Sequence, residues 1–296
     1  MIKQIRKMKK CKKNYRKIKL KRSKGVEENR LLVHTIERWE KINKKGGNCM
    51  KKMLENCKFK SVADRKNQRG KCKASELMVN FSYSNKKLQD TDEVAFIQWN
   101  ITAIDNCPWA TDMCKKSCYA KKAEKMYPSV KTRRKMHDEV ARREDFVEIM
   151  VQQIEFELSR KKYQNKTIFF RIHESGDFFS YEYLEKWYHI TKKFEGNSRI
   201  VFEAYTKSLP LFDMLYQKYG KNSVNIKVLS SIWDDTTKEM VELTRKLDLE
   251  VYTAIDGRKI DKFLQENPRF QQCKCEECGK CKKCYVENCS LIVAIH

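Results

Sequence analysis

The chain has 296 residues, of which 41% are hydrophobic, so it can bury one barrel-sized core or the cores of two ordinary domains. It contains thirteen cysteines but no apolar segment typical of an export signal or a membrane span. We therefore expect a cytoplasmic protein with no part in a membrane. Cytosolic thiols are kept reduced, so the cysteines favour metal binding over disulfides.

The net charge of +25 is concentrated near the start of the chain. Residues 1–93 hold 29 Lys and Arg against 10 Asp and Glu, whereas residues 94–296 hold 35 against 29. Residues 1–24 carry thirteen basic side chains and no acidic one, which predicts a disordered arm.

The basic arm could neutralise phosphates, which predicts salt-sensitive binding of RNA or DNA. A solubilising tail and attraction to an anionic membrane surface are the alternatives. The side chains expected to contact nucleic acid are Lys9, Lys10, Lys12, Lys13, Arg16, Lys17, Lys19, Lys21 and Arg22. Residues 25–93 are expected to form a mostly helical or irregular extension, with helices near 28–41 and 50–57.

From residue 94 onward, strand-like apolar runs alternate with stretches of helical periodicity. The helical stretches cover 140–158 and 236–247, and two others begin at the expected N-caps Ser180 and Ser208. Such alternation predicts a parallel sheet, and six units suit either a doubly wound sheet or a partial βα barrel. The predicted strands are 94–101, 167–172, 199–205, 224–229, 250–254 and 291–295.

Three cysteines, Cys107, Cys114 and Cys118, lie in the loop 106–120, just after the first predicted strand of this series. Three thiolates can hold three irons of a cubane cluster and leave the fourth iron open to another ligand. A zinc site or buried, reduced cysteines are the alternatives. Ligands in βα folds gather at the carboxyl ends of strands, where this loop lies, so an iron-sulfur cluster is favoured over zinc.

This arrangement resembles the radical-SAM superfamily, in which a three-cysteine loop with a neighbouring aromatic residue follows the first strand of a six-unit partial barrel. The dipeptide Cys118-Tyr119 is similar to the end of that loop, although the spacing here is Cys-x6-Cys-x3-Cys rather than Cys-x3-Cys-x2-Cys. The resemblance implies a partial (βα)6 TIM-type barrel over residues 94–296. It also implies a [4Fe-4S] cluster whose open iron binds S-adenosylmethionine (SAM).

The chain is also similar to the phage and mobile-element family called "gene product 88". The similar segments are Asn-Cys-Pro-x-Ala-Thr at 106–111, Cys-x3-Cys-Tyr-Ala at 114–120, Phe-Arg-Ile-His-x-x-Gly-Asp-Phe at 170–178, Tyr-Thr-Lys-Ser at 205–208 and the cysteines at 273–289. This resemblance implies that the chain shares the architecture of that family and acts in a phage or mobile element. It implies little about activity.

Polar side chains follow the second, third and fourth predicted strands of the βα series. In radical-SAM proteins, an acidic residue at the end of the second strand binds the amino group of SAM, which implies a role for Glu174 or Asp177. Lys207 could pair with a carboxylate and Ser230 could bond to a sugar hydroxyl. Tyr119, which follows the last cysteine of the cluster loop, is a further expected cofactor contact. The alternatives are a solvated loop, a helix cap at Asp177 and a satisfied hydroxyl at Ser230.

A second cysteine group occupies the C-terminal insert 273–289 and consists of Cys273, Cys275, Cys278, Cys281, Cys284 and Cys289. The spacing Cys278-x2-Cys281-x2-Cys284 is typical of loops around iron-sulfur clusters, with Cys275 or Cys289 as the fourth ligand. Zinc is the alternative, because the same segment contains two Cys-x2-Cys pairs. As a cluster site, it resembles the auxiliary clusters of several radical-SAM enzymes.

These observations predict a radical-SAM-like iron-sulfur enzyme that acts on or with nucleic acid and needs an electron donor. The alternatives are a non-catalytic iron-sulfur regulator that binds nucleic acid and a zinc-stabilised binding module.

Overall fold

The computed structural model describes residues 79–83, 85, 87–274 and 277–295. A boundary between Glu76 and Leu77 divides the chain into two units, and all the described residues belong to the second. The predicted basic arm 1–24, the helices predicted over 28–41 and 50–57, and the predicted ligand Cys275 lie outside the described residues. Within the described part, no helix is both long and apolar enough to span a bilayer.

Eight strands form one sheet in the order β1-β2-β3-β4-β5-β6-β8-β7. Only the pairing of β1 with β2 is antiparallel. The strands are β1 (Ser82–Tyr83), β2 (Val94–Trp99), β3 (Thr167–Ile172), β4 (Ile200–Thr206), β5 (Lys227–Trp233), β6 (Glu250–Ile255), β7 (Phe270–Gln272) and β8 (Ser290–Ala294). All six predicted strands are present, and the predicted α/β class is confirmed.

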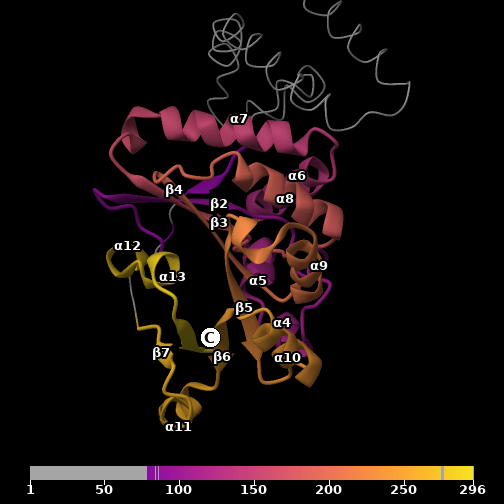
Figure 1. Cartoon of the computed structure of the whole chain (residues 1–296), viewed down its shortest axis with the longest axis vertical. Helices are drawn as coiled ribbons and strands as arrows, with labels where there is room; N and C mark the ends of the chain where they lie inside the picture. The colour runs from indigo at the N-terminus through magenta and orange to yellow at the C-terminus, as the bar shows by residue number, and fades with distance from the viewer. Residues whose placement is uncertain (1–78, 84, 86, 275–276, 296) are drawn as a thin grey trace, which may run out of the picture. The chain divides into compact units, whose positions relative to one another are not determined.

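The six long parallel strands β2, β3, β4, β5, β6 and β8 are neighbours in the order in which the chain reaches them. A doubly wound sheet would contain a reversal of strand order, and this series contains none. Right-handed crossovers that always advance in one direction place the connecting helices on one face of the sheet. Accordingly, Figure 1 shows α8 and α9 on the opposite side of the strands from α12 and α13.

The helices that connect the strands are α4 (Asp112–Lys116), α5 (Tyr119–Met126), α6 (Pro128–Ala141), α7 (Phe146–Ser159), α8 (Tyr181–Lys192), α9 (Leu209–Tyr219), α10 (Lys238–Lys246), α11 (Ile260–Glu266), α12 (Cys278–Cys281) and α13 (Lys283–Val286). Helices α6 to α9 pack on one face of the sheet, whereas α12 and α13, near the C-terminus, pack on the other. Short 3-10 helices occupy Lys161–Tyr163, Lys221–Ser223 and Gly257–Lys259.

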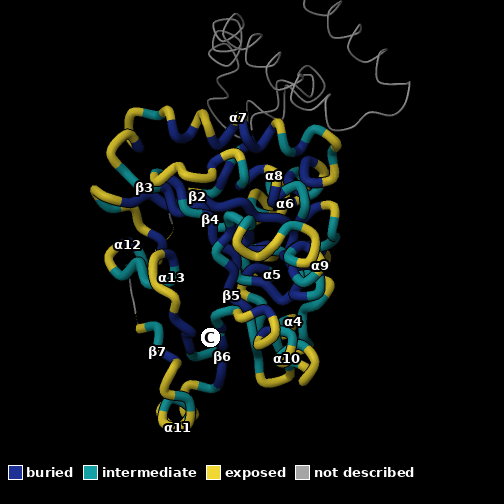
Figure 2. Tube along the Cα trace, viewed as in Figure 1, coloured by how far each residue is buried: buried dark blue, intermediate teal, exposed yellow. Residues whose placement is uncertain are grey.

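Among the described residues there are three buried apolar clusters, and alternation along β2, β3 and β4 separates two of them, because successive side chains point to opposite faces of a sheet. Ile97, Phe170 and Phe202 belong to the larger core, which they share with α7, α8 and α9. Phe96 and Phe169 face the other way and pack with residues of α12 and α13. Figure 2 shows the strands as the buried centre, while α11 is largely exposed.

The single helix predicted over 140–158 is wrong, because α6 ends at Ala141 and α7 begins at Phe146. The two helices are separated by a turn, in which Arg143 donates two hydrogen bonds of 2.7 and 2.8 Å to the Asp145 carboxylate. The N-cap predicted at Ser180 is confirmed, since its Oγ accepts a hydrogen bond of 3.2 Å from Tyr183 N. Ser208 stands at the start of α9 but donates its hydroxyl to Phe178 O instead.

Candidate functional site

The loop after β2 forms a series of tight turns that present three thiols. Cys107 N donates to Ile104 O at 3.0 Å, and Ile104 takes a left-handed conformation with φ of 71°. Cys118 caps α5, where its Sγ accepts a hydrogen bond of 3.4 Å from Lys121 N. Cys107, Cys114 and Cys118 are all half-buried and free of disulfides. The backbone therefore fixes where each thiol of the loop lies.

The structure brings these three thiols close enough to influence one another's ionisation. Burial raises the pKa of the Cys107 thiol to about 12, and the charges of Asp177, Cys114 and Cys118 add to that rise. Burial also raises the pKa of Cys114, while the nearby Lys207 ammonium opposes the rise. The predicted set therefore forms one cluster of thiols at the carboxyl edge of the sheet.

Asp177 ties the end of β3 to the end of β4. Its carboxylate accepts hydrogen bonds from Thr206 Oγ1 at 2.6 Å, Lys207 N at 2.9 Å and Phe178 N at 2.8 Å. Burial raises the pKa of the Asp177 carboxyl, and these hydrogen bonds oppose the rise. Both carboxylate oxygens thus hold the backbone of the site.

Lys207 points from the end of β4 toward the first cysteine set. Its Nζ donates to Ser231 Oγ at 2.7 Å and lies 5.4 Å from the centre of the Trp233 ring. Burial lowers the pKa of Lys207, whereas the charges of Cys114 and Asp177 oppose that change. Lys207 is therefore a buried cation that interacts with the thiols of Cys107 and Cys114.

The other residues predicted to contact SAM are Tyr119, Glu174 and Ser230, and their side chains point in different directions. Tyr119 Oη donates to Glu174 O at 2.6 Å, which joins α5 to the loop after β3. The carboxylate of the half-buried Glu174 accepts a hydrogen bond of 3.0 Å from Asn85 Nδ2. Ser230 points away from the site, because its Oγ lies 2.8 Å from Thr244 Oγ1 of α10. Its neighbour Ser231 faces the site instead, and alternation along a longer β5 would have identified it.

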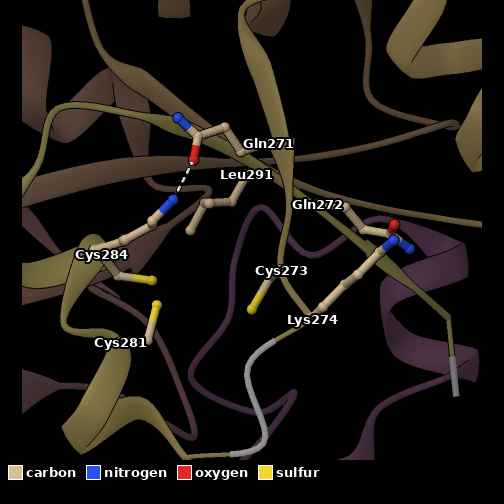
Figure 3. A pocket seen from close by; sticks show the side chains of 8 residues that line it. Gln271, Gln272, Cys273, Lys274, Cys281, Cys284 and Leu291 are labelled. Carbon is tan, nitrogen blue, oxygen red and sulfur yellow. Dashed lines mark hydrogen bonds between the residues drawn. The ribbon is translucent and has the colours of Figure 1, made fainter.

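The C-terminal segment gathers a second set of thiols around a cavity of about 310 Å³. Cys273, Cys281 and Cys284 line this cavity, and Figure 3 shows the last two pointing into the same space while Cys273 extends toward them from the end of β7. The thiol of Cys278 interacts electrostatically with those of Cys273 and Cys281. Four of the predicted cysteines therefore meet.

Cys289 does not join this second set. It is buried at the start of β8, and the charged groups that influence its thiol are those of Glu287, Lys227, Glu250 and Lys283. The sequence pattern favoured Cys275 or Cys289 as the fourth member, but among the described residues Cys273 occupies that place. Cys273 continues the β7–β8 pairing, since its N donates to Ile292 O at 2.9 Å.

Aromatic and charged side chains of β3, β4 and α13 pack against the second cysteine set, and we call them its floor. The Tyr285 ring stacks on Phe169 at 4.4 Å, and the Arg171 guanidinium lies 4.2 Å from the centre of the Tyr205 ring. Burial raises the pKa of the Glu203 carboxyl to about 7, and neither of its oxygens makes a hydrogen bond of normal geometry within the described residues. The sequence reasoning missed Arg171 and Glu203, although both interrupt apolar strands.

Burial raises the pKa of the Cys284 thiol to about 12, with the Glu203 carboxylate adding to the rise and the Tyr205 hydroxyl opposing it. Lys87 Nζ donates to Cys273 Sγ at 3.6 Å. Across the described ranges, no group of three or more His, Cys, Asp or Glu side chains is arranged to hold a single metal ion. Each set is therefore a cluster of free thiols.

Comparison with known proteins gives one match. The family model described as "Gene product 88" matches residues 66–287, three quarters of the chain, a range that includes both cysteine sets. No curated protein and no solved structure matches the chain.

Proposed function

The chain belongs to the gene product 88 family, and from that premise we propose that it is an iron-sulfur enzyme of radical-SAM type. The principal cluster would be held by Cys107, Cys114 and Cys118. The observation that carries the proposal is the meeting of these three thiols with Asp177 and Lys207 at the carboxyl edge of a sequentially ordered parallel sheet.

The proposal includes a partial (βα)6 barrel for the second unit. Sequential strand order supports it, because helices placed on one face of a twisted sheet make the sheet curve around its other face. A site at the carboxyl ends of the strands would then lie at the mouth of the barrel.

The donor set fits an iron-sulfur cubane better than a single ion. In a cubane, each thiolate binds a different iron atom, so the three sulfurs surround the group and need not converge on one point. The thiols are half-buried, which limits the access of water. When bound there, the cluster would supply one electron for the reductive cleavage of SAM, and a separate donor would have to provide that electron.

The chain's own residues would orient the ligands around this site. Asp177 holds the ends of β3 and β4 together, so its carboxylate positions the site and is not free to bind an amino group. The half-buried Glu174 carboxylate, with one hydrogen bond from a side-chain amide, is the better candidate for that contact. Lys207 and Ser231 present a hydrogen-bonded pair beside the thiols, suited to a carboxylate or a sugar hydroxyl.

The second cysteine set is proposed to hold another iron-sulfur cluster through Cys273, Cys278, Cys281 and Cys284. The cavity beside these thiols supports a group larger than one ion. Zinc is the alternative, since four thiolates also suit tetrahedral coordination.

Anaerobic purification followed by iron, sulfide and zinc analysis tests the metal content. We expect iron with matching sulfide, a changed EPR signal when SAM is added to the reduced protein, and 5′-deoxyadenosine as a product. Stoichiometric zinc without sulfide would exclude the cluster, and iron without either response to SAM would exclude the enzyme.

A non-catalytic iron-sulfur protein that binds nucleic acid is the second candidate function. It is favoured by the hydrogen bonds of Asp177, which leave only one of the two acidic residues considered for the SAM amino group available. In either case, we propose that the basic arm 1–24 contacts RNA or DNA, as its thirteen Lys and Arg suggest.

A further inference from the structure

The net positive charge of residues 94–296 is concentrated in one segment. Residues 113–137 hold nine Lys and Arg and a single acid, Glu124, for a net charge of +8. Residues 94–296 as a whole carry only +6, so the rest of that region is slightly acidic. This segment covers most of α4, all of α5 and the first part of α6.

Most of these basic side chains face solvent. The buried Arg134 and the half-buried Lys121 are paired with Glu124 and therefore serve the fold. Five exposed lysines make no ion pair with any described residue. We call them, with the three exposed apolar and aromatic residues among them, the α4–α6 basic surface: Lys116, Lys122, Lys125, Lys131, Lys135, Tyr119, Met126 and Tyr127.

Aromatic and apolar side chains are interleaved with these lysines. Tyr119, Met126 and Tyr127 are 55%, 67% and 54% exposed, and they are three of the seven large hydrophobic side chains exposed in the described part of the chain. Residues 119, 122 and 126 follow helical spacing, so Lys122 lies between Tyr119 and Met126 on one side of α5. Lysines alternating with aromatic rings suit a phosphate backbone with stacked bases.

The basic surface adjoins the first cysteine set directly. Cys114 lies within α4, Cys118 caps α5, and Tyr119 is anchored to the loop after β3 through its bond to Glu174 O. We propose that the α4–α6 basic surface binds single-stranded nucleic acid and guides a base toward the Cys107, Cys114 and Cys118 site. The inference rests on the proposed function for the chemistry at that site, but the binding itself is independent of it.

A single strand fits this surface better than a duplex or a lipid bilayer. Stacking on exposed rings needs bases that are not paired, and chemistry on a base requires that it leave the duplex. α5 has only eight residues, and its opposite side is buried through Ala120 and Glu124. It therefore lacks the long apolar face with which a helix lies in a membrane interface.

Charge reversal on the full-length protein tests the surface. The variant Lys122→Glu/Lys125→Glu/Lys131→Glu/Lys135→Glu should bind a fluorescent single-stranded oligonucleotide at least about tenfold more weakly, measured by anisotropy. Its slope of log Kd against log salt concentration should fall by up to about 3, at about 0.7 for each phosphate that is no longer neutralised.

The matched control reverses four other exposed basic residues, as Lys238→Glu/Arg245→Glu/Lys259→Glu/Lys262→Glu on and beside α10 and α11. It changes the net charge equally, so it reproduces any long-range effect on the basic arm. Equal losses in the two variants would overturn the proposal, and so would tighter binding to phosphatidylserine vesicles than to the oligonucleotide. Circular dichroism should show the same fold in both variants.

A smaller change tests stacking separately from charge. Tyr127→Ala should weaken oligonucleotide binding about tenfold, whereas Tyr127→Phe should retain it, because the ring and not the hydroxyl stacks. Equal binding by both variants would contradict the role of the ring. Iron and sulfide content, measured on the same preparations, shows whether the cluster proposal fails independently of nucleic-acid binding.

Discussion

The two cysteine sets of this chain lie in different surroundings. Cys107, Cys114 and Cys118 come from one loop and its two short helices, and the buried charges beside them are brought by the ends of β3 and β4. The second set combines cysteines of α12 and α13 with Cys273 from the end of β7, above an aromatic floor. In the first set, the cysteines are close together in the sequence and their charged neighbours come from distant segments. In the second set, one of the cysteines, Cys273, also comes from a separate segment.

This difference suggests different roles for the two sets. Lys207 and Asp177 place polar groups beside the first set, as a site that binds a substrate requires. Tyr285 and Phe169 pack beneath the second set, as structural metal sites and buried redox centres require. The following experiments test whether the two sets are independent, from the largest expected effect to the smallest.

Removing the thiols of one set should halve the metal content and leave the other set loaded. We expect Cys107→Ser/Cys114→Ser/Cys118→Ser to lose about four irons per chain and the response to SAM, since three ligands of one cubane are removed. Cys278→Ser/Cys281→Ser should lose the other half of the metal and keep a SAM-dependent EPR change.

The matched control for these variants is Cys289→Ser, because Cys289 lies apart from both sets. Its metal content should equal that of the wild type. Loss of all iron in either multiple variant would show that the two sets are not independent.

The floor of the second set should make the protein sensitive to alkali. Glu203 titrates near pH 7 when folded, against 4.5 for an ordinary glutamate, so the folded state holds its proton more tightly. This stabilising effect is complete below about pH 4.5 and is lost as the pH rises through 7. Relative to wild type, Glu203→Gln should gain about 3 kcal/mol of unfolding free energy across that range.

Chemical denaturation at a series of pH values measures this gain. Glu242→Gln, at an exposed position of α10, is the control and should follow the wild type. Parallel curves for Glu203→Gln and the wild type would show that the carboxyl is not buried as described.

The packing of α6 on β2 should instead make the protein sensitive to acid. His137 stacks on Trp99 at 4.1 Å, and burial lowers its pKa from 6.5 to about 4. The unfolded state then binds the proton more tightly, so stability is complete above about pH 6.5 and is lost as the pH falls toward 4.

The variant His137→Gln keeps an N–H donor for Asn100 O but cannot take up a proton in this range. Between pH 6.5 and 4, the wild type should lose about 3 kcal/mol more unfolding free energy than the variant. Equal losses in the wild type and the variant would contradict a buried, neutral imidazole.

Close packing should limit side-chain size at α12. A Cβ at Gly279 would lie 2.4 Å from Gln89 O, so Gly279→Ala must displace the helix that carries Cys278 and Cys281. We expect a loss of about 2 kcal/mol in unfolding free energy and weaker metal retention by the second set. At Gly257 the nearest atom would lie at an ordinary 3.4 Å, so Gly257→Ala is the control and should change neither quantity.

Adjacent serines on β5 test which face of the sheet belongs to the first site. Ser230→Ala removes the bond to Thr244 and should cost about 1 kcal/mol of stability without changing the EPR response to SAM. Ser231→Ala frees Lys207 Nζ and should change that response with little loss of stability. The reverse pattern would place the site on the other face of the sheet.

The regular part of the fold could be predicted from the sequence because the βα units are local. Each long strand carries its own apolar run, so the six strands were found even though β5 extends past its polar Ser230 and Ser231. β1 and β7 have only two and three residues, too few to show a periodic pattern. Strand order was left between two possibilities, because it depends on how distant units pack together.

The candidate site was predicted in part. The Cys107, Cys114 and Cys118 set depends on one loop, so its spacing was sufficient to identify it. Ser230 was chosen in place of Ser231 because the strand was predicted to end at residue 229. Both serines lie within β5, where alternation places them on opposite faces. Arg171 and Glu203 gave only the weak signal of polar residues within apolar strands.

The sequence by itself determined the grouping of the cysteines along the chain, the α/β class and the position of the first thiols after β2, since all three depend on short-range patterns. Only the tertiary structure decided that Cys273 rather than Cys289 joins the second set, and that Lys207 faces the first. The physical reason is that such meetings depend on strand register and on the packing of segments far apart in the chain.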